Sequence, residues 1–157
     1  MRKKFFWAIG ILFVLFIGTL WGIEITDKQK LQKVSAEARV TQTLYEQVDQ
    51  TVTIMKSYEE EVIPKEVKEL GVHSLNTTRD LYMRTIISLD PNYDDRKYRT
   101  LSNWIGKVKF LISKEKITDE DLETLDAYRV KIKKFMEQKN ETLNQLEYKV
   151  NHYWWDS

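Results

Sequence analysis

The sequence contains no cysteine. Disulfide bonds, cysteine-ligated metal sites and thiol nucleophiles are therefore excluded. A chain without such cross-links has to be stabilised by its hydrophobic core, and its 157 residues are enough for one domain with a core of its own.

Proline and glycine are scarce, with two prolines and five glycines in the whole chain. No stretch alternates apolar and polar residues regularly enough to predict a β-strand. Helical periodicity instead continues through nearly all of the chain after residue 23, without an internal repeat or a low-complexity linker. The sequence therefore predicts an all-α fold.

Neither sign of charge is in surplus, because 25 Lys and Arg stand against 24 Asp and Glu. A nucleic-acid-binding domain carries a basic surplus gathered on one face. The balance therefore argues against a nucleic-acid partner.

The charged residues are unevenly distributed, and none lies in Phe5 to Ile23, FFWAIGILFVLFIGTLWGI. As a helix this stretch would be about 28 Å long, close to the roughly 30 Å hydrocarbon core of a bilayer. Trp7 and Trp21 lie near its two ends, where amphipathic indole rings favour the membrane interface. We predict a single transmembrane helix over 5–23, with Trp7 and Trp21 as membrane-interface residues.

This helix would divide the chain into a basic segment 1–4, an anchor 5–23 and a helical-bundle domain 24–157. The bases of segment 1–4 place the N-terminus in the cytoplasm by the positive-inside rule, and the domain outside it at the cell membrane. A cleaved signal peptide is the alternative. It would need a shorter apolar core followed by small residues, whereas Leu20 and Trp21 stand at that place. The pattern favours a retained signal anchor.

Four helices are expected in the domain. The first spans 24–63 and is ended or kinked by Pro64, after which two further turns would stop at Gly71. Two short helices follow over 75–89 and 96–113, and a capping box of Thr118 and Asp121 opens the fourth, which runs to Tyr153. We expect the long first and fourth helices to form an antiparallel coil, with the short hairpin packed against its distal half.

Each long helix carries an apolar seam with three- and four-residue spacing. The first seam comprises Leu31, Val34, Ala38, Thr41, Tyr45, Val48, Val52, Met55, Glu59 and Val62. The second comprises Leu122, Leu125, Arg129, Ile132, Met136, Lys139, Leu143, Leu146, Val150 and Tyr153. If the seams start level, Val62 lies near Leu122 and Glu59 about one turn from Arg129. Glu59 and Arg129 then form a polar pair that fixes the register, or both side chains extend to solvent at the rim.

Metal sites and catalysis find little support. Asp90, Asn92 and Asp94 match the start of a calcium-binding loop, but Asp95 replaces the required glycine and Leu101 the required glutamate. A turn followed by a helix cap is the better interpretation. The two histidines, His73 and His152, are isolated, and no phosphate-binding loop or nucleophile–base motif occurs. We expect no cofactor and no enzymatic activity. The triplets that begin at Asn76 and Asn140 match the glycosylation pattern, which is common by chance.

The sequence ends with Tyr153, Trp154 and Trp155 close to its last residue, although chain ends are normally polar and frayed. Trp154 and Trp155 would close the base of the bundle against Ile25 and Leu31, rest in the lipid headgroups as membrane-interface residues, or dock a protein partner. In each interpretation the end of the chain is held in place.

These features favour a membrane-anchored interaction or scaffold protein, an accessory subunit of a membrane assembly. Its partners would be the membrane and other proteins, and its long helices also suit association with a second copy. Two alternatives stay open. One is a ligand-sensing bundle that acts through a partner, and the other is an envelope protein of a phage or mobile element, for lysis, exclusion or immunity.

Overall fold

The computed structural model describes residues 2–58, 62–89 and 95–153, and the side chains of these residues except for 2–14 and 95–98. All regular secondary structure in this part of the chain is helical. The elements are α1 (Arg2–Ser57), α2 (Lys65–Leu89), α3 (Asp95–Ile112) and α4 (Asp119–Asn151). The predicted all-α fold is confirmed.

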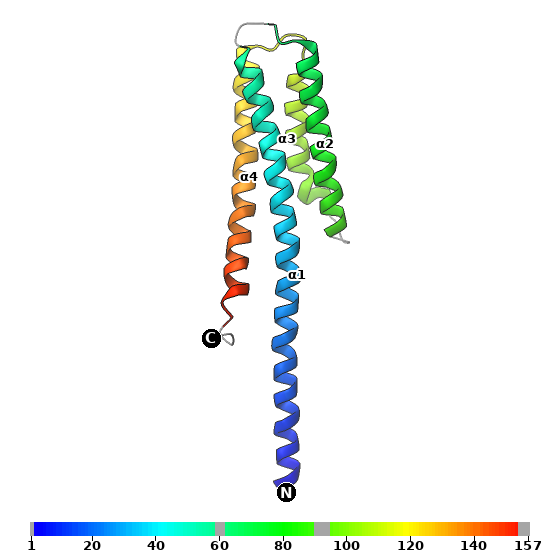
Figure 1. Cartoon of the computed structure of the whole chain (residues 1–157), viewed down its shortest axis with the longest axis vertical. Helices are drawn as coiled ribbons and strands as arrows, with labels where there is room; N and C mark the ends of the chain where they lie inside the picture. Colours follow the sequence, from blue (N-terminus) through cyan, green and yellow to red (C-terminus); the bar gives the residue numbers. More distant parts are fainter. Residues whose placement is uncertain (1, 59–61, 90–94, 154–157) are drawn as a thin grey trace.

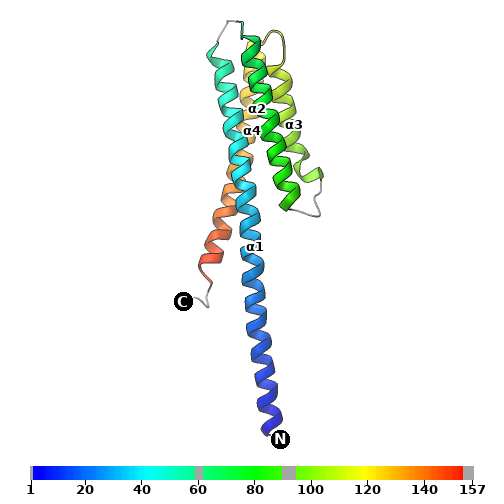
Figure 2. The same ribbon diagram turned by 45° about the vertical axis from the view of Figure 1, so that its right-hand side comes forward.

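The four helices run alternately up and down and form a bundle in which α1 packs on α2 and α4, and α3 packs on α2 and α4 (Figure 1). The two long helices, α1 and α4, lie side by side, and the shorter α2 and α3 lie along the part of this pair that is far from the N-terminus of α1 (Figure 2). This arrangement agrees with the predicted hairpin against the distal half of a long pair. The N-terminal part of α1 projects beyond the end of α4 (Figure 1).

The core follows the predicted helix faces. Every described member of both seams except Val62 is buried or partly buried, as are the inward faces of α2 and α3. The side chains with almost no exposure include Leu44, Val48, Val52, Leu75, Tyr82, Leu101, Ile105, Ile112, Leu125 and Ile132. Leu44 is not part of the predicted seam, because it lies on a second buried face of α1. Val62 was assigned to the first seam and is instead 85% exposed.

The predicted boundaries between the first two helices were wrong. Helix α1 ends at Ser57 rather than at residue 63. Helix α2 begins at Lys65, and the carbonyl of Pro64 accepts the first hydrogen bonds, from the Val67 and Lys68 amides at 3.1 and 3.2 Å. Pro64 therefore precedes a helix, where its missing N–H is no disadvantage.

Gly71, which was expected to stop a helix, lies inside α2. A methyl group added there would lie 3.0 Å from the Thr51 Cγ2 of α1 and 3.5 Å from the Met55 Cε. Gly71 thus lets the backbone of α2 approach α1 closely.

The predicted capping box at the start of α4 is confirmed. The Thr118 hydroxyl accepts a hydrogen bond from the Asp121 amide at 3.3 Å, and the Asp121 carboxylate accepts one from the Thr118 amide at 3.1 Å. Asp121 also accepts a hydrogen bond from the Lys114 ammonium at 2.6 Å. The link between α3 and α4 is therefore fixed by one carboxylate.

A membrane-spanning helix is not found among the residues that the structure describes, since none of their helices is both long and apolar enough. The side chains of the first half of the predicted anchor lie outside the described part.

Candidate functional site

Three regions are candidate sites: a charged cluster between α1 and α4, a polar cluster at the C-terminal end of α4, and a groove at the end of the bundle that is far from the N-terminus of α1.

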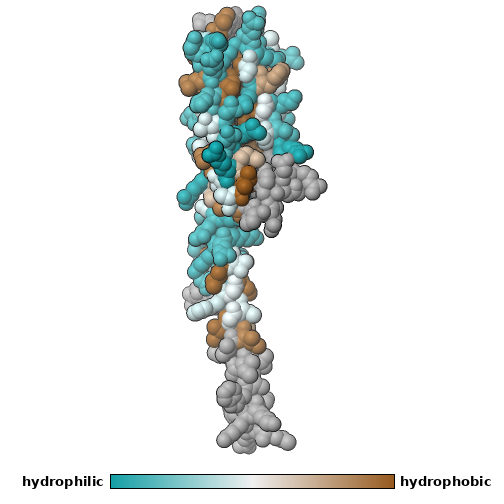
Figure 3. Space-filling model, turned by 90° about the vertical axis from the view of Figure 1, so that its right-hand side faces the viewer, coloured by the Kyte–Doolittle hydropathy of each residue, from teal (hydrophilic) through white to brown (hydrophobic). Residues whose placement is uncertain are grey.

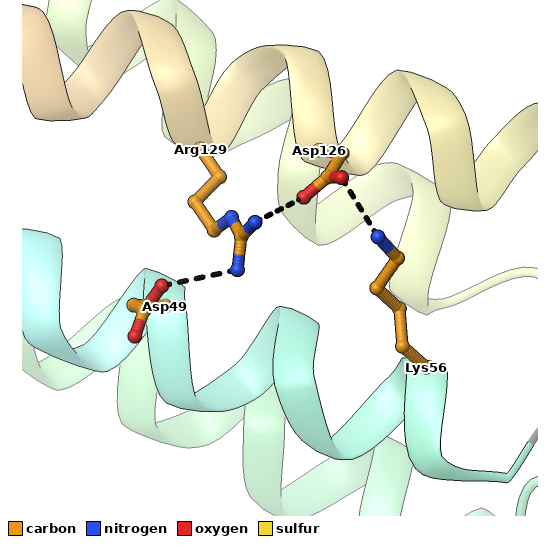
Figure 4. Close-up of polar contacts among 4 residues, drawn as sticks. All are labelled: Asp49, Lys56, Asp126 and Arg129. Atoms are coloured by element: carbon orange, nitrogen blue, oxygen red, sulfur yellow. Dashed lines mark hydrogen bonds and ion pairs between the residues drawn. The ribbon is translucent and has the colours of Figure 1, made fainter.

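The charged cluster joins α1 and α4 and consists of Asp49, Lys56, Asp126 and Arg129 (Figure 4). The Arg129 guanidinium lies 3.2 Å from Asp49 Oδ1 and 2.8 Å from Asp126 Oδ1, and Lys56 Nζ lies 2.7 Å from Asp126 Oδ2. The hydrogen bond from Lys56, with Arg129 close by, lowers the pKa of the Asp126 carboxyl below its ordinary value. Two cations and two carboxylates thus alternate across the helix pair.

The charged cluster contains Arg129, one of the two residues of the predicted register pair. Glu59 lies outside the described residues. Arg129 contacts Asp49 on α1, which stands ten residues before Glu59 in the sequence. Among the described residues Arg129 has Asp49 and Asp126 as partners, and its pairing with Glu59 stays a prediction.

Lys139, the other basic residue of the second seam, forms an ion pair with Glu37 of α1. Glu37 is almost completely buried, and the neighbouring Thr41 is fully buried and donates its hydroxyl hydrogen to the Glu37 carbonyl at 2.8 Å. Sequence reasoning missed Glu37, because it lies beside the apolar seam of α1 rather than within it. A paired charge of this kind sets which residues lie opposite one another.

The lower end of α4 is fastened to α1 by a group that we call the base clasp, consisting of Asp27, Lys149 and Tyr153. The Tyr153 hydroxyl donates a hydrogen bond to Asp27 Oδ2 at 2.9 Å, and Lys149 Nζ lies 2.6 Å from the same oxygen. These hydrogen bonds, that from Lys149 first, lower the pKa of the Asp27 carboxyl.

Apolar contacts support the base clasp. Leu146, Val150 and Tyr153 form a buried cluster, against which Leu31 and Val34 of α1 pack, separate from the main core. Tyr153 is only 7% exposed, so the expectation that the end of the chain is held in place is confirmed for this residue. Asp27 was not predicted, although it stands one turn before Leu31, where the first seam would continue.

Of the predicted membrane-interface residues, the structure describes only the side chain of Trp21, which is 69% exposed on the projecting part of α1. The Trp7 side chain, Trp154 and Trp155 lie outside the described part of the chain. The neighbours of Trp21 on α1 are also apolar and exposed, among them Leu15, Phe16, Ile23 and Ile25.

The distal groove lies between the start of α2 and the end of α3, and has a volume of about 760 Å³. Ile63 and Val72 contribute apolar surface, and His73 and Lys68 contribute polar groups. Lys68 Nζ donates to the backbone carbonyls of Lys114 and Glu115, at 2.8 and 2.6 Å, and so satisfies acceptors left free just after the end of α3.

The remaining sequence candidates do not converge. His73 is exposed on α2, and the exposed His152 follows α4, with its ring stacked on Tyr148 at 4.3 Å. Among the described residues no group of three or more His, Asp or Glu side chains is placed to hold a metal ion. The loop residues Asp90, Asn92 and Asp94 lie outside this part. Both glycosylation-pattern asparagines lie in helices and are partly buried: Asn76 accepts a hydrogen bond from Lys109, and Asn140 donates one to the Met136 sulfur.

The charged cluster and the base clasp thus each join α1 to α4 through ion pairs. Comparison with known proteins finds no matching family model, no similar curated protein and no similar solved structure.

Proposed function

We propose that this chain is a single-pass membrane protein whose helical bundle docks protein partners outside the cytoplasm, as an accessory subunit of a membrane assembly. Residues 5–23 are the anchor, segment 1–4 stays in the cytoplasm, and 24–157 forms the docking domain.

One observation carries this proposal. Helix α1 continues without a break from Arg2 into the bundle, and its projecting part exposes apolar side chains from Leu15 to Ile25. Figure 3 shows these apolar residues below the bundle, where the hydrophilic surface ends. Water solvates such a surface poorly, whereas a bilayer or the helices of a membrane assembly cover it.

The surface of the α2–α3 hairpin supports the docking part of the proposal. Large apolar side chains are exposed there, with Leu70 at 69% and Phe110 at 64%. Figure 3 shows apolar patches scattered among hydrophilic ones over this side of the bundle. Partner helices bind through such side chains in a groove or on a helix face.

Topology is tested by thiol labelling, because the chain has no cysteine of its own. A membrane-impermeant thiol reagent should label Ser157→Cys in intact cells, whereas Lys3→Cys should react only after lysis. The reverse pattern would place the bundle in the cytoplasm, and equal labelling of both variants in intact cells would argue against a spanning anchor.

Docking is tested by purification from solubilised membranes with two matched variants. We expect a partner protein to copurify with the parent chain and to be lost with Phe110→Ser on α3. The same partner should still copurify with the control Val130→Ser, which alters an exposed apolar residue on α4. Recovery of this chain alone from the parent preparation would count heavily against an accessory subunit.

The distal groove favours a second candidate function, a ligand sensor that signals through a partner. Its volume of about 760 Å³ is within the range of small-molecule sites. A compound that binds there should raise the melting temperature of the full chain in detergent, and Val72→Glu should abolish that rise. A rise that persists in this variant would place the compound elsewhere.

A further inference from the structure

The α2–α3 hairpin holds its positive charges in a different way from the α1–α4 pair. In the charged cluster and the base clasp, the bases are matched with carboxylates. Between α2 and α3, two partly buried cations are instead bound to neutral side chains. Arg79 Nε donates a hydrogen bond to the Ser102 hydroxyl at 3.1 Å, and Lys109 Nζ donates one to the side-chain carbonyl of Asn76. In the described part of the chain neither cation forms an ion pair with a carboxylate.

The sequence around these cations supplies few carboxylates. Residues 99–114, which cover most of α3, contain bases and no Asp or Glu. On α2, Glu69 is already paired with Lys65 at 3.5 Å. Asp80 is exposed, and it points about 100° away from its neighbour Arg79 around the helix. The hairpin therefore retains a local positive charge, which attracts an anion more strongly where it is partly removed from water.

Both cations lie beside the distal groove. Asn76, the partner of Lys109, lines this groove together with apolar residues. Arg79 follows Asn76 by three residues and so lies on the same side of α2. We call the distal groove together with Arg79, Ser102 and Lys109 the hairpin surface. It combines an apolar lining with cations that lack a charged partner.

The hairpin surface is open on its α3 side. Gly106 lies between Ser102 and Lys109, and the spacing of four and three residues places all three on one side of α3. A methyl group added to Gly106 would meet no neighbouring element within 4 Å. The exposed Phe110 directly follows Lys109. The backbone of a binding partner can therefore approach α3 closely beside these groups.

The hairpin surface lies far from the lipid of the proposed anchor. Gly71 of α2 lies against Thr51 of α1, which is about 42 Å along the helix from Ile23. If residues 5–23 span a bilayer, the headgroups extend only roughly 5–7 Å beyond the hydrocarbon core. The anionic groups must therefore come from a molecule outside the bilayer. Carboxylates next to apolar side chains match both the cations and the groove.

We propose that the hairpin surface binds an acidic segment of the partner protein, whose Asp or Glu side chains pair with Arg79 and Lys109 and whose apolar side chains enter the distal groove. This inference deepens the docking part of the proposed function, on which it rests for the existence of a partner. A carboxylate would give each cation a charged acceptor, and such hydrogen bonds are stronger than those between a cation and a neutral group. The cations thus select the partner, and the groove adds contact area.

The test uses the full chain in detergent and a fluorescent helical peptide that carries glutamates on one face and leucines on the other. A second peptide carries glutamine in place of each glutamate. Fluorescence anisotropy should show tighter binding of the glutamate peptide, and added salt should weaken this peptide alone. The double variant Arg79→Gln/Lys109→Gln should weaken its binding roughly tenfold or more, because hydrogen bonds between charged groups are lost.

Two further variants separate the role of these cations from charge in general. Lys134→Gln removes an exposed base from α4 and should leave peptide binding unchanged. Gly106→Met keeps every charge but fills the open space beside Lys109, so it should weaken binding. Glutamine can still donate a hydrogen bond at positions 79 and 109, and a melting temperature close to that of the parent checks that the double variant is folded.

Equal binding of the two peptides, or an equal loss with Lys134→Gln, would overturn the inference, because binding would not depend on these two cations. Displacement of the peptide by inorganic phosphate, but not by chloride at the same ionic strength, would also overturn it and indicate a site for small anions.

Purification from solubilised membranes separates this inference from the proposed function. A partner that is lost with Phe110→Ser but retained by the double variant would overturn the inference and leave the accessory subunit intact. Recovery of the parent chain alone, with the glutamate peptide still bound through Arg79 and Lys109, would refute the accessory subunit and support the chemistry of the hairpin surface.

Discussion

Gly71 and Gly106 both lie inside helices, but an added methyl group would meet different surroundings at the two positions. At Gly106 in α3 nothing lies within 4 Å of the new carbon, so Gly106→Ala should gain about 1 kcal/mol of helix stability. At Gly71 in α2 the new carbon would lie 3.0 Å from Thr51 Cγ2. Thr51 cannot easily turn aside, because it is buried and its hydroxyl donates to the Gln47 carbonyl at 2.7 Å.

Overpacking of this kind typically costs 1–3 kcal/mol, roughly the same as or more than the gain in helix propensity. Gly71→Ala should therefore leave the protein unchanged or destabilise it by up to about 2 kcal/mol, whereas Gly106→Ala stabilises it. For a chain of this length 1 kcal/mol corresponds to roughly 2–4 °C, so the two variants should melt several degrees apart. Circular dichroism of the full chain in detergent measures the difference.

Thr51→Ser provides the control, because it removes the methyl group in question and retains the hydroxyl. In the Gly71→Ala background it should restore most of the lost stability, and the two substitutions should therefore be strongly non-additive. If Gly71→Ala stabilised the protein as much as Gly106→Ala does, the close packing of α2 on α1 would be refuted.

Three further predictions concern the α1–α4 pair and the paired aspartates. Leu146→Asp should bury a charge in the cluster at the base and lower the free energy of unfolding by roughly 2–5 kcal/mol. Gln145→Asp on the exposed face should melt like the parent. Equal melting temperatures of the two variants would refute the assigned seam. Lys139→Met should destabilise the protein by about 1–3 kcal/mol, because it leaves Glu37 unpaired. The further change Glu37→Gln should recover part of the lost stability. Simple additivity in this double-mutant cycle would argue against the ion pair. Folding lowers the carboxyl pKa of three aspartates, Asp27, Asp121 and Asp126. Their contribution to stability is therefore complete well above about pH 4, the pKa of an unfolded aspartate, and is lost as the pH falls from there toward the lower pKa values of the folded state. Melting temperatures measured from about pH 6 to about pH 3 should accordingly fall less steeply for the triple Asp→Asn variant, and parallel curves would contradict this assignment.

The sequence specifies which helix faces are buried more directly than it specifies how the helices are aligned. The spacing of Leu125, Ile132, Met136 and Leu146 identifies one face of α4 whatever that helix packs against. The axial offset between α1 and α4 is a different matter, since sliding one helix by two turns still leaves apolar faces in contact. Polar contacts such as the one between Arg129 and Asp49 specify the offset, and their partners are known only once the helices are placed.

Local signals for helix ends were less reliable where another helix interferes. The capping box at Thr118 was predicted correctly, because both partners are three residues apart and need nothing else. Gly71 was an equally plausible helix stop, yet it lies inside α2. A glycine fits there because Thr51 of α1 occupies the space that a side chain would need, and this contact is visible only in the tertiary structure. The base clasp was missed for the same reason, since Asp27 and Tyr153 lie at opposite ends of the domain sequence.

The continuity of α1 sets a length scale for anything that the protein touches. From Ile23 to Ser57 the helix rises about 50 Å without a break. Because this helix is continuous, it keeps the distal end of the bundle at a nearly constant distance from the apolar stretch. A partner that binds the distal groove while residues 5–23 lie in a membrane must therefore itself reach about 50 Å from the bilayer, and inserting or deleting turns of α1 would change that reach by about 5.4 Å each.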